Sequence, residues 1–429
     1  MTQLSCPALM ISAPASGSGK TTVVAALARL HSRQGRKVRV FKCGPDFLDP
    51  QIHAIASSAP CENIDLSMCG EADARWRLAR AAQDSDLILI EDVMGLYDSE
   101  QSGAAMARAL GVPILLVVDA QAMGGSFGAV CYGLKHYRDG APVTAVLANR
   151  VGSDYHAELC RNSLTEGIAW SGALMRNEEI LLPERHLGLL PAVEIADLER
   201  RLDHAADTLK QSGFHALPPS VAFDVPPTPN WPALLSGKTI AVADDAAFCF
   251  RYPANEEYLR AAGAELVFFS PLHEPELPAC DAVWLPGGYP ELHAETISEN
   301  HTMKASLQSH VATGKPLLAE CGGMMACFEH LISIDGTSHT GFGLLPGESR
   351  MQTRLAGLGL LSADLPEGSI TGHCFHYSTT SSPLVPITQA RKLHGKGSEP
   401  VYRNARLTAS YMHAYFPSNP QASARLFLC

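Results

Sequence analysis

The stretch Ile11–Thr22 reads I-S-A-P-A-S-G-S-G-K-T-T and joins a short apolar run to the helical run Val23–His31. A strand that ends in a Gly-rich turn, a lysine and two hydroxyl residues is typical of a loop that holds nucleotide phosphates at the start of a helix. The first Gly of the usual pattern would fall at position 14, where this chain has Pro14, so the loop is a variant form. A plain turn that opens a helix is the alternative. The residues predicted to contact ATP are Gly17, Ser18, Gly19, Lys20, Thr21 and Thr22.

Short apolar runs that end in Gly, Asp or Asn recur through the N-terminal half, separated by helical stretches. This is the pattern of buried parallel strands in an α/β sheet. We therefore predict an α/β fold of the P-loop NTPase type, with ligands beyond the carboxyl ends of the strands. The predicted strands are Ala8–Ser12, Val38–Lys42, Leu87–Glu91, Ile114–Asp119 and Val143–Asn149.

Carboxylates follow two of these predicted strands. Asp46 and Asp49 come after the second strand, and Glu91 and Asp98 end or follow the third. Taken singly, each acid is more often a helix cap or a solvated loop residue. Mg²⁺ prefers one or two carboxylates together with phosphate oxygens and waters, so together these acids predict a metal and substrate site at the edge of the sheet. The residues predicted to hold the metal are Thr21, Asp46 and Glu91.

Prolines crowd the chain between Leu217 and Pro232, at a density that neither a helix nor a central strand tolerates. We predict a first domain at residues 1–216, a linker at 217–236 and a second domain at 237–429. After the linker another α/β series begins, and the last part of the chain is richer in strands. The predicted elements are strands Thr239–Ala243, Leu266–Phe269, Ala282–Leu285, Pro316–Glu320, Ile370–Tyr377, Val401–Tyr402 and Leu407–Tyr411, and a helix over Glu256–Ala262.

A candidate nucleophile lies in Leu317–Met325 (L-L-A-E-C-G-G-M-M), which is an apolar strand, a cysteine, two glycines and the start of an apolar helix. A tight strand-to-helix turn exposes the side chain at its tip and places it at a helix N-terminus, which favours a thiolate. Cys321 therefore has the setting of a catalytic thiol. Taken alone, a buried inert cysteine is an equally common explanation.

Two further segments supply partners for Cys321. Gly287 and Gly288 end another predicted strand, and their backbone N–H groups can form an oxyanion hole. His413 ends a late strand and can take the thiol proton and return it to a leaving group. A Gly-Gly turn and a lone histidine are each common, so only their combination with Cys321 predicts catalysis.

The run Gly372–Tyr377 (G-H-C-F-H-Y) superficially suggests zinc ligands. The spacing of His373, Cys374 and His376 matches no common zinc pattern, and a strand would point His373 and Cys374 to opposite faces. We interpret the run as strand packing or a substrate contact rather than as a zinc site.

The bulk composition narrows the class of protein. The formal net charge of -11 argues against a broad surface for nucleic acid or anionic membrane. The 12 cysteines form no C-x-x-C pair, so free thiols in a reducing cytoplasm are the simplest account. No apolar run is long enough for a membrane helix, and the start of the chain lacks a basic signal region. We expect a cytoplasmic protein with neither a nucleic-acid nor a membrane partner.

Together these segments resemble the cobalamin-pathway glutamine amidotransferases, the family that includes cobyrinic acid a,c-diamide synthases and cobyric acid synthases. The resemblance runs nearly end to end. It rests on A-P-A-S-G-S-G-K-T-T (13–22), F-K-C-G-P-D-F-L-D-P (41–50), E-D-V-M-G-L-Y-D (91–98), P-G-G-Y-P-E-L (286–292), E-C-G-G-M-M (320–325), G-H-C-F-H-Y-S (372–378) and Y-M-H-A-Y-F (411–416).

The resemblance implies an ATP domain similar to dethiobiotin synthetase, joined to a class I glutamine amidotransferase domain of flavodoxin-like fold. The family's nucleophile falls on Cys321 and its activating histidine on His413. The implied reaction uses Mg²⁺, ATP and glutamine to amidate the a- and c-acetate carboxylates of cobyrinic acid through an acyl phosphate, with ammonia passing between the domains. The residues assigned to activation of the substrate carboxylate are Asp46, Asp49, Glu91 and Asp98.

Two positions depart from the family pattern. Most class I glutaminases have Glu two residues after the histidine, where this chain has Tyr415; the cobalamin branch also lacks this Glu, and the group that orients His413 is not identified. Asp92 stands where relatives often have Gly, which can alter the charge around the metal. A macrocycle with many carboxylates also needs cations, and the candidates are Lys42, Arg150, Arg176 and Arg251, although surface solvation is the better explanation for any one of them.

Three other functions stay open. The same reaction on metal-free hydrogenobyrinic acid leaves the ATP and glutamine motifs unchanged, and a,c-diamidation of nickel-sirohydrochlorin is a further alternative. The third is a P-loop regulatory or partitioning ATPase with a non-catalytic second domain, which predicts an inert Cys321. A homodimer is left open as the assembly state.

Overall fold

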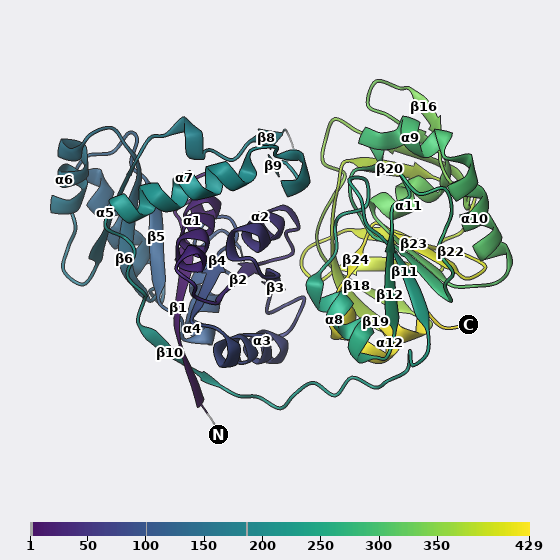
Figure 1. Cartoon of the computed structure of the whole chain (residues 1–429), viewed down its shortest axis with the longest axis horizontal. Helices are drawn as coiled ribbons and strands as arrows, with labels where there is room; N and C mark the ends of the chain where they lie inside the picture. Colours follow the sequence, from purple (N-terminus) through teal and green to yellow (C-terminus); the bar gives the residue numbers. More distant parts are fainter. Residues whose placement is uncertain (1–2, 100, 186–187) are drawn as a thin grey trace. The chain divides into compact units, whose positions relative to one another are not determined.

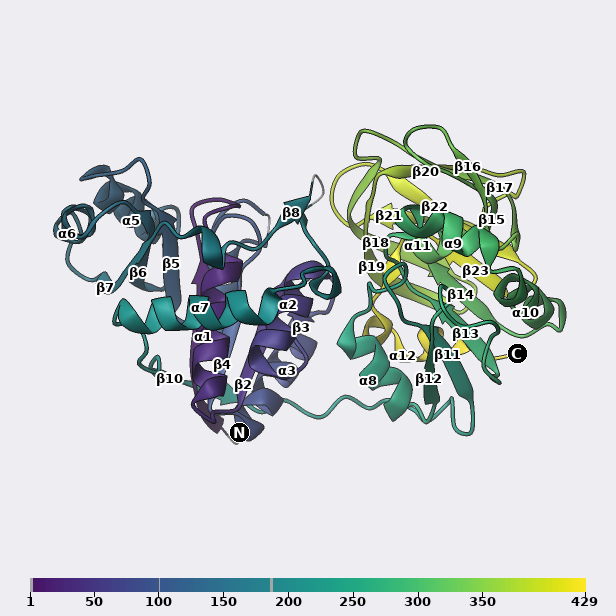
Figure 2. The same cartoon turned by 45° about the horizontal axis from the view of Figure 1, so that its top comes forward.

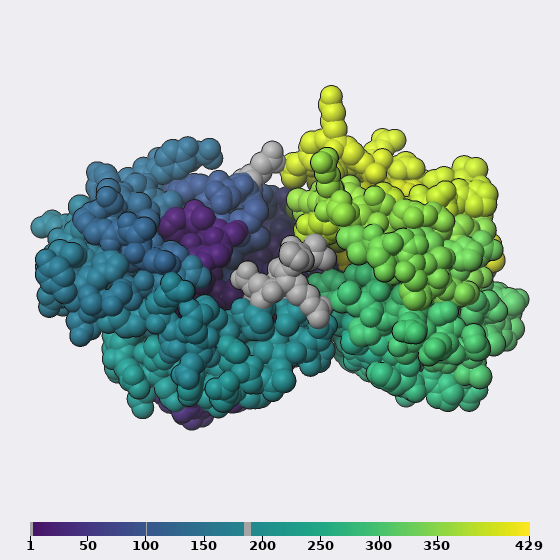
Figure 3. All heavy atoms as spheres, turned by 90° about the horizontal axis from the view of Figure 1, so that it is seen from above, coloured from purple at the N-terminus to yellow at the C-terminus, as the bar shows by residue number. Residues whose placement is uncertain are grey.

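The computed structural model describes residues 3–99, 101–185 and 188–429 and divides the chain into two compact units, Met1–Thr228 and Pro229–Cys429. Each unit is built from one continuous stretch of chain, as the colours of Figure 3 show. Every large apolar cluster lies within one unit or within the other, so each unit has its own core. Within the described ranges, no helix combines the length and the hydropathy that a bilayer crossing requires.

The first unit is a three-layer α/β fold around a parallel sheet (Figure 1). Its strands are β1 (Gln3–Ser12), β2 (Val38–Cys43), β3 (Glu62–Ile64), β4 (Leu87–Glu91), β5 (Ile114–Asp119), β6 (Val143–Val151), β7 (Ala169–Met175), β8 (Glu184–Arg185) and β9 (Gly188–Leu189). Its helices are α1 (Lys20–Arg33), α2 (Leu48–Ser57), α3 (Glu71–Asp84), α4 (Gly103–Leu110), α5 (Ser126–His136), α6 (Asp154–Asn162) and α7 (Leu198–Gln211).

The apolar alternation along each strand builds two cores, one on each face of the sheet. Ala8 and Met10 of β1 pack with α3, α4 and α5, whereas Leu9 and Ile11 pack with α1, α2 and α7. The strand order is β3-β2-β4-β1-β5-β6-β7, which puts β1 and its phosphate loop near the middle of the sheet. The strands predicted from the sequence are present, and β3 and β7 extend the sheet at its two edges.

Part of the Pro-rich segment predicted to be a linker is a strand. β10 (Ser220–Asp224) pairs antiparallel with the start of β1, where Ser220 lies opposite Pro7. Val221 and Phe223 are buried in the first core, while the alternating residues are exposed. The chain then has no regular structure from 225 to 233. Residues 220–224 therefore belong to the sheet of the first unit, and the irregular linker begins after them.

The second unit contains a long mixed sheet and a smaller one (Figure 2). The long sheet holds β11 (Thr239–Ala243), β12 (Glu265–Phe269), β13 (Ala282–Leu285), β14 (Leu317–Glu320), β18 (Gly357–Leu365), β19 (Gly368–His376), β21 (Thr388–Lys392), β22 (Ser398–Asn404), β23 (Leu407–Ser410) and β24 (His413–Ala414). The smaller sheet holds β15 (Phe328–Ile332), β16 (Ser338–Thr340), β17 (Leu345–Met351) and β20 (Ser378–Ser381). The helices are α8 (Pro253–Ala261), α9 (Ala294–Glu299), α10 (His301–Ala312), α11 (Gly322–Cys327) and α12 (Pro420–Arg425).

The long sheet begins as a parallel α/β sheet and continues as an antiparallel one. Its order is β12-β11-β13-β14-β23-β22-β21-β18-β19-β24, and β11 to β14 with β23 form the parallel part. Helices α9, α10 and α11 pack on one face and α8 and α12 on the other. The turns after β13 and β14 therefore meet at the carboxyl edge of the parallel part.

Candidate functional site

The phosphate loop lies between β1 and α1, and its glycines are required by geometry. Gly17 and Gly19 have φ values of 74° and 99°, in the left-handed region that side chains rarely adopt. A Cβ on Gly19 would also lie 2.2 Å from Asn149 Nδ2, which donates a 2.9 Å hydrogen bond to the Ser18 carbonyl. Asn149, in β6, thus fixes the loop, a role that the sequence did not reveal.

Lys20 is buried and its Nζ lies beside the loop. It donates to the Met94 carbonyl and, at 3.4 Å, to the Ala15 carbonyl. Burial lowers the pKa of Lys20, and the nearby Glu91 charge opposes that shift. Two backbone carbonyls therefore hold the ammonium at a position where phosphate oxygens can replace them.

Glu91, at the end of β4, is the centre of a buried polar cluster. It accepts a 2.8 Å hydrogen bond from Thr21 Oγ1, forms a 3.1 Å ion pair with Lys42 and contacts His53 of α2. Burial alone would raise the pKa of Glu91, but Lys42 and His53 hold it below its ordinary value. Lys42 Nζ also lies 2.5 Å from Asp49. The cluster keeps a carboxylate ionised beside the hydroxyl that ends the phosphate loop.

The other predicted acids divide between this cluster and its surroundings. Burial, together with the Asp46 and Glu91 charges, raises the pKa of Asp49, so these acids belong to one electrostatic group. Asp46 also accepts a 2.8 Å hydrogen bond from the Leu48 amide at the start of α2. Asp98 is exposed and accepts from the Gly95 amide at 2.9 Å, so in the structure it holds a turn outside the cluster.

Asp92 ties the sheet to the helix that follows. It accepts from Ser12 Oγ at 2.5 Å and from the Val93 amide at 2.8 Å, and burial raises its pKa to about 6. A Cβ on Gly103, the first residue of α4, would lie 1.8 Å from Asp92 Oδ2. Asp92 is thus a buried residue that packs against α4. Its charge also lies close enough to Lys20 to raise the pKa of that ammonium group.

The cations proposed for a carboxylate-rich substrate are all paired with acids in the structure. Arg150 lies 2.6 Å from Asp119 and Arg176 lies 2.9 Å from Glu178. Arg251, in the second unit, pairs with Asp244 and Glu256 at 2.8 and 3.2 Å. Lys42 is buried between Asp49 and Glu91, so in the structure its ammonium group organises the acid cluster and is not exposed to solvent.

A hollow of about 340 Å³ adjoins the phosphate loop. Its lining includes Gly19 and Thr22 of the loop and Gln121, Asn149 and Arg150 from the ends of the next strands. Amide and guanidinium groups are the hydrogen-bonding groups that a nucleobase or ribose can use. The hollow therefore extends the phosphate site on the side of β5 and β6.

Cys321 lies at the tip of the turn between β14 and α11. Its φ and ψ of 45° and −107° are unusual for a residue with a side chain. The conformation is fixed from both sides, because its amide donates to the Ser410 carbonyl at 2.8 Å and its carbonyl accepts from the Met325 amide at 2.9 Å. The sharp turn predicted from the sequence is therefore present.

The protonation state of Cys321 differs from the sequence expectation. Burial raises its pKa well above the ordinary value, the Glu291 charge adds to the shift, and the Gly322 amide opposes it. The helix that follows spans only Gly322–Cys327, so its terminus does not outweigh the loss of hydration. The resting group is a thiol, and a base is needed to make it nucleophilic.

The Gly287–Gly288 turn packs directly on the Cys321 turn and on His413. A Cβ on Gly287 would lie 2.2 Å from His413 Cε1, and one on Gly322 would lie 2.9 Å from the Gly288 nitrogen. The missing side chains thus let the two turns and the imidazole approach one another. The amide of Gly322, the residue after Cys321, is a further donor that was not predicted, although a tight strand-to-helix turn places this amide beside the nucleophile.

His413 is 2% exposed and lies in β24, opposite His373 of β19. Burial lowers its pKa well below the ordinary value, and His373 and His376 add to the shift. The imidazole is therefore neutral at neutral pH and can accept a proton. The structure brings Cys321, the Gly pair and His413, which are far apart in sequence, to one edge of the sheet.

Two buried polar residues fix the segment that carries His413. Glu320 accepts from Trp284 Nε1 at 2.9 Å and from the Ala414 amide at 2.8 Å, and burial raises its pKa to about 8. Asn255 Nδ2 donates to the Ala414 carbonyl at 2.8 Å. Neither residue was predicted, because their partners are distant in sequence and no motif connects them.

Comparison with known proteins gives matches to both units. Residues 9–190 match the model of the CobQ/CobB/MinD/ParA nucleotide binding domain, and residues 239–421 match that of the CobB/CobQ-like glutamine amidotransferase domain. The chain is 54% identical over 427 residues to the hydrogenobyrinate a,c-diamide synthases of Stutzerimonas stutzeri (strain A1501) and Pseudomonas aeruginosa, covering 99% of this chain and 99% and 98% of theirs. It is 47% identical over 425 residues to the cobyrinate a,c-diamide synthase of Herminiimonas arsenicoxydans, covering 98% of this chain and 96% of the relative.

Proposed function

Because the chain belongs to the family of the hydrogenobyrinate and cobyrinate a,c-diamide synthases, we propose that it amidates the a- and c-carboxylates of such a corrinoid, using ATP and glutamine. It is a glutamine-dependent ligase that forms amide bonds. The observation that carries the proposal at atomic scale is the close packing of the Cys321 turn, the Gly287–Gly288 turn and His413.

In the proposed glutaminase step, Cys321 Sγ attacks the carboxamide carbon of glutamine as His413 takes the thiol proton. Backbone amides at Gly287, Gly288 and Gly322 stabilise the oxyanion of the tetrahedral intermediate. The C–N bond breaks, ammonia leaves with the proton from His413, and a thioester remains. Water then hydrolyses the thioester to glutamate and restores the thiol.

In the proposed synthetase step, the phosphate loop and Lys20 hold ATP, and a substrate carboxylate oxygen attacks the γ-phosphorus to give ADP and an acyl phosphate. Activation is necessary because hydroxide is a poor leaving group from a carboxylate at neutral pH. Ammonia attacks the acyl carbon, phosphate leaves, and the nitrogen loses a proton to give the amide. Two such cycles make the diamide.

The chain also offers a fitting set of ligands for Mg²⁺. Thr21 Oγ1 and Glu91 Oε1 are 2.8 Å apart at the end of the phosphate loop, and Glu91 is kept ionised. A hydroxyl and one carboxylate, with Asp46 and Asp49 nearby, are the oxygen donors that Mg²⁺ prefers beside phosphates. When bound, the ion would neutralise charge on the phosphates; we propose Thr21, Asp46 and Glu91 as the residues that hold it.

The replacement of Cys321 by Ala tests whether ammonia release from glutamine and amide formation take place at separate sites. We expect glutamine-dependent amidation to fall at least about 1,000-fold, because the nucleophile is lost, while amidation from ammonium salts continues. Product formation is measured with each nitrogen source in parallel. Full glutamine-dependent activity in Cys321→Ala would remove the basis of the proposal.

The metal status of the corrinoid is decided by a competition between substrates. The two relatives at 54% identity are named hydrogenobyrinate a,c-diamide synthases, and the relative at 47% is named a cobyrinate a,c-diamide synthase. Hydrogenobyrinate and cobyrinate are therefore both substrate candidates. Mass spectrometry of products from the two acids, offered side by side, reports the preferred macrocycle and the number of amides. We expect a diamide from at least one; amidation of neither contradicts the proposed substrate class.

We also propose that the enzyme works in a reducing compartment, the cytoplasm. No disulfide joins any of the 12 cysteines, all of which lie in the part of the chain that the structure describes. Ten of them are buried, Cys249 is half-buried and Cys429 is exposed. So many cysteines without a disulfide favour a compartment in which thiols are kept reduced.

A further inference from the structure

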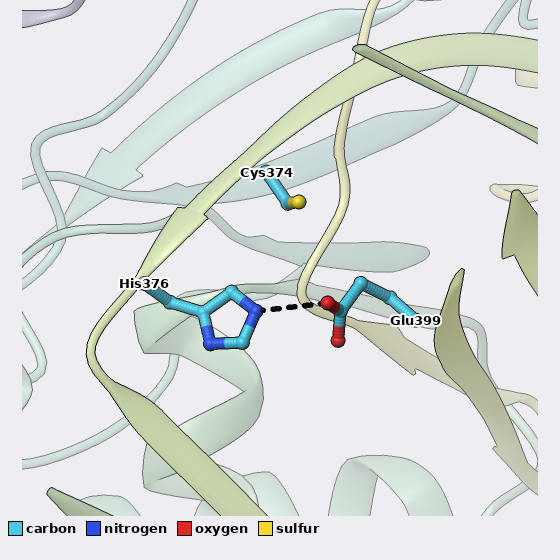
Figure 4. Close-up of side chains that lie close together, drawn as sticks. All are labelled: Cys374, His376 and Glu399. Carbon is cyan, nitrogen blue, oxygen red and sulfur yellow. Dashed lines mark ion pairs between the residues drawn. The ribbon is translucent and has the colours of Figure 1, made fainter. Parts of the chain in front are cut away.

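A cluster of three metal-ligating side chains lies in the second unit, outside the set of residues used above. Cys374 and His376 lie two residues apart on β19 and share a face, and Glu399 comes from β22. Figure 4 shows the Cys374 and His376 side chains pointing toward Glu399. One ligand atom from each lies within 4.8 Å of the others, although β18 and β21 separate β19 from β22 in the sheet.

The hydrogen bonds of His376 fix the direction of its lone pair. Its Nδ1 lies 2.9 Å from the Ser378 carbonyl oxygen, which can only accept, so Nδ1 carries a proton. In the neutral ring Nε2 then bears the lone pair, and this atom lies 3.3 Å from Glu399 Oε1. Among the described residues the buried Nε2 has no hydrogen-bond partner. Two acceptor atoms therefore face each other unless Nε2 carries a proton, as in the ion pair that Figure 4 marks, or a metal cation binds between them.

The surroundings hold these groups in place. The His376 ring stacks on Tyr411, with centroids 3.6 Å apart and planes within 2°. Cys374 is fully buried. Gly357 lies opposite His376, and a Cβ there would lie 2.1 Å from Nε2 and 2.7 Å from Glu399 Oε1. The backbone of Gly357 has no positive φ, so the space between the two side chains explains this glycine.

We propose that Cys374, His376 and Glu399 bind a divalent transition metal ion of the zinc type. A thiolate, an imidazole nitrogen and a carboxylate form a mixed S, N and O set that suits such an ion and not Mg²⁺ or Ca²⁺. The Ser378 carbonyl orients the imidazole through Nδ1, as the outer partners of metal-bound histidines do. Three protein ligands leave a fourth position for water.

The proposed site departs from the interpretation of G-H-C-F-H-Y given above. The spacing of the three residues matches no common zinc pattern, and His373 and Cys374 alternate along β19, so both features disfavour zinc. The pair that shares a face is Cys374 and His376, and the third ligand, Glu399, follows in a different strand. Spacing along one segment could not reveal it.

The bound ion would act on the glutaminase site through Tyr411. Tyr411 stacks on His376, accepts a 2.8 Å hydrogen bond from Ser378 Oγ, and lies two residues before His413. A metal that joins β19 to β22 thus braces the segment that leads from β23 to His413. Its role is positional, because none of its three ligands is a proposed catalytic residue.

Metal retention by the full-length chain tests the proposal. The purified chain, saturated with Zn²⁺ and desalted without Mg²⁺ or nucleotide, is expected to keep about one zinc per chain by elemental analysis. Cys374→Ala and Glu399→Gln are each expected to weaken zinc binding at least about 10-fold. With Co²⁺ as the probe, the thiolate-to-cobalt absorption in the near-ultraviolet should be present in the parent chain and lost in Cys374→Ala. Circular dichroism verifies that each variant is folded.

Two cysteine variants serve as controls. Cys327→Ala removes another buried thiol of the same unit, and Cys321→Ala removes the proposed nucleophile; both should retain zinc as the parent does. Zinc that is lost with Cys321 and kept without Cys374 would place the ion at the nucleophile and overturn the proposal. A parent chain that retains no zinc would equally overturn it, in favour of a protonated His376 paired with Glu399.

Discussion

Cys321 and His413 are both buried, and burial acts on their two protonation equilibria in opposite directions. It raises the pKa of Cys321 and lowers that of His413. The resting pair is therefore a thiol and a neutral imidazole, without net charge in a medium that hydrates charges poorly. Proton transfer must accompany the attack on glutamine, and the oxyanion is the first charge that the backbone amides have to stabilise.

This pairing predicts an unusual pH profile. Because the pKa of His413 is lowered, its basic form persists as the pH falls, and we expect glutaminase kcat/KM to hold from pH 8 to about 6. Glutamate release from pH 5 to 9 measures it. Burial raises the pKa of Glu291 to about 7, so Glu291→Gln is the control that removes any titration of that neighbour. A midpoint near 6.5 that survives in Glu291→Gln would show an unperturbed His413.

Lys20 gives a second residue-level prediction. Lys20→Ala should lower amidation at least about 100-fold with either glutamine or ammonium, because the charge that meets the ATP phosphates is gone. Glutamine hydrolysis by Cys321 should remain measurable. The exposed Lys210, in the last turn of α7, supplies the control Lys210→Ala, for which we expect parent rates. Normal amidation by Lys20→Ala would place the ATP site elsewhere.

Sequence reasoning indicated candidate residues within motifs and did not indicate those whose partners are distant in sequence. Lys20, Cys321 and His413 were predicted because each stands in a recognisable local pattern. His53 and Glu320 were not, since a histidine within a helix and a glutamate within a strand acquire meaning only from Glu91 and from the Ala414 amide. Packing between distant segments brings each of these pairs together, and no spacing within one segment of the sequence indicates such a contact.

The turn after β13 and the turn after β14 lie so close to each other that no side chain fits between them. Gly287→Ala should lower glutaminase kcat at least about 10-fold, because its Cβ would lie 2.2 Å from His413 Cε1 and displace the imidazole. Ammonium-dependent amidation should be unchanged. Amidation rates measured with glutamine and with ammonium show whether only the glutamine-dependent reaction is slowed.

Gly133→Ala is the matched control for that substitution. Gly133 lies within α5, where a Cβ would meet nothing within 4 Å, so alanine should leave both rates intact and stabilise the helix by up to about 1 kcal/mol. Unchanged glutaminase activity in Gly287→Ala would mean that the two turns can separate without loss.

The elements that sequence reasoning missed have specific physical reasons. β3 (Glu62–Ile64) is too short to show a pattern, and in β7 Gly172 has a φ of 132° and interrupts the apolar run. β10 lies between two groups of prolines, which hid its alternating residues. The short, mostly apolar strands β4, β5, β11 and β13 were predicted with their observed bounds, because burial on both faces demands an unbroken apolar run.

At the scale of the whole molecule, separate cores predict separate unfolding. The apolar clusters of Met1–Thr228 share no residue with those of Pro229–Cys429, so calorimetry should resolve two transitions. A non-hydrolysable ATP analogue with Mg²⁺ should raise one midpoint, since a ligand at 100 times its Kd adds about 2.7 kcal/mol to the unit that binds it. The other midpoint should not move, and the same run with Lys20→Ala should show no shift. A single transition that moves as a whole contradicts this expectation.

The placement of the thiols has a practical consequence for optical work. Cys429 is exposed, Cys249 is half-buried and the other ten cysteines are buried. A maleimide dye applied briefly to the folded protein would therefore attach first at Cys429, without any engineered cysteine. The dye is distant in sequence from the phosphate loop, so fluorescence anisotropy can report nucleotide binding without any substitution in the chain.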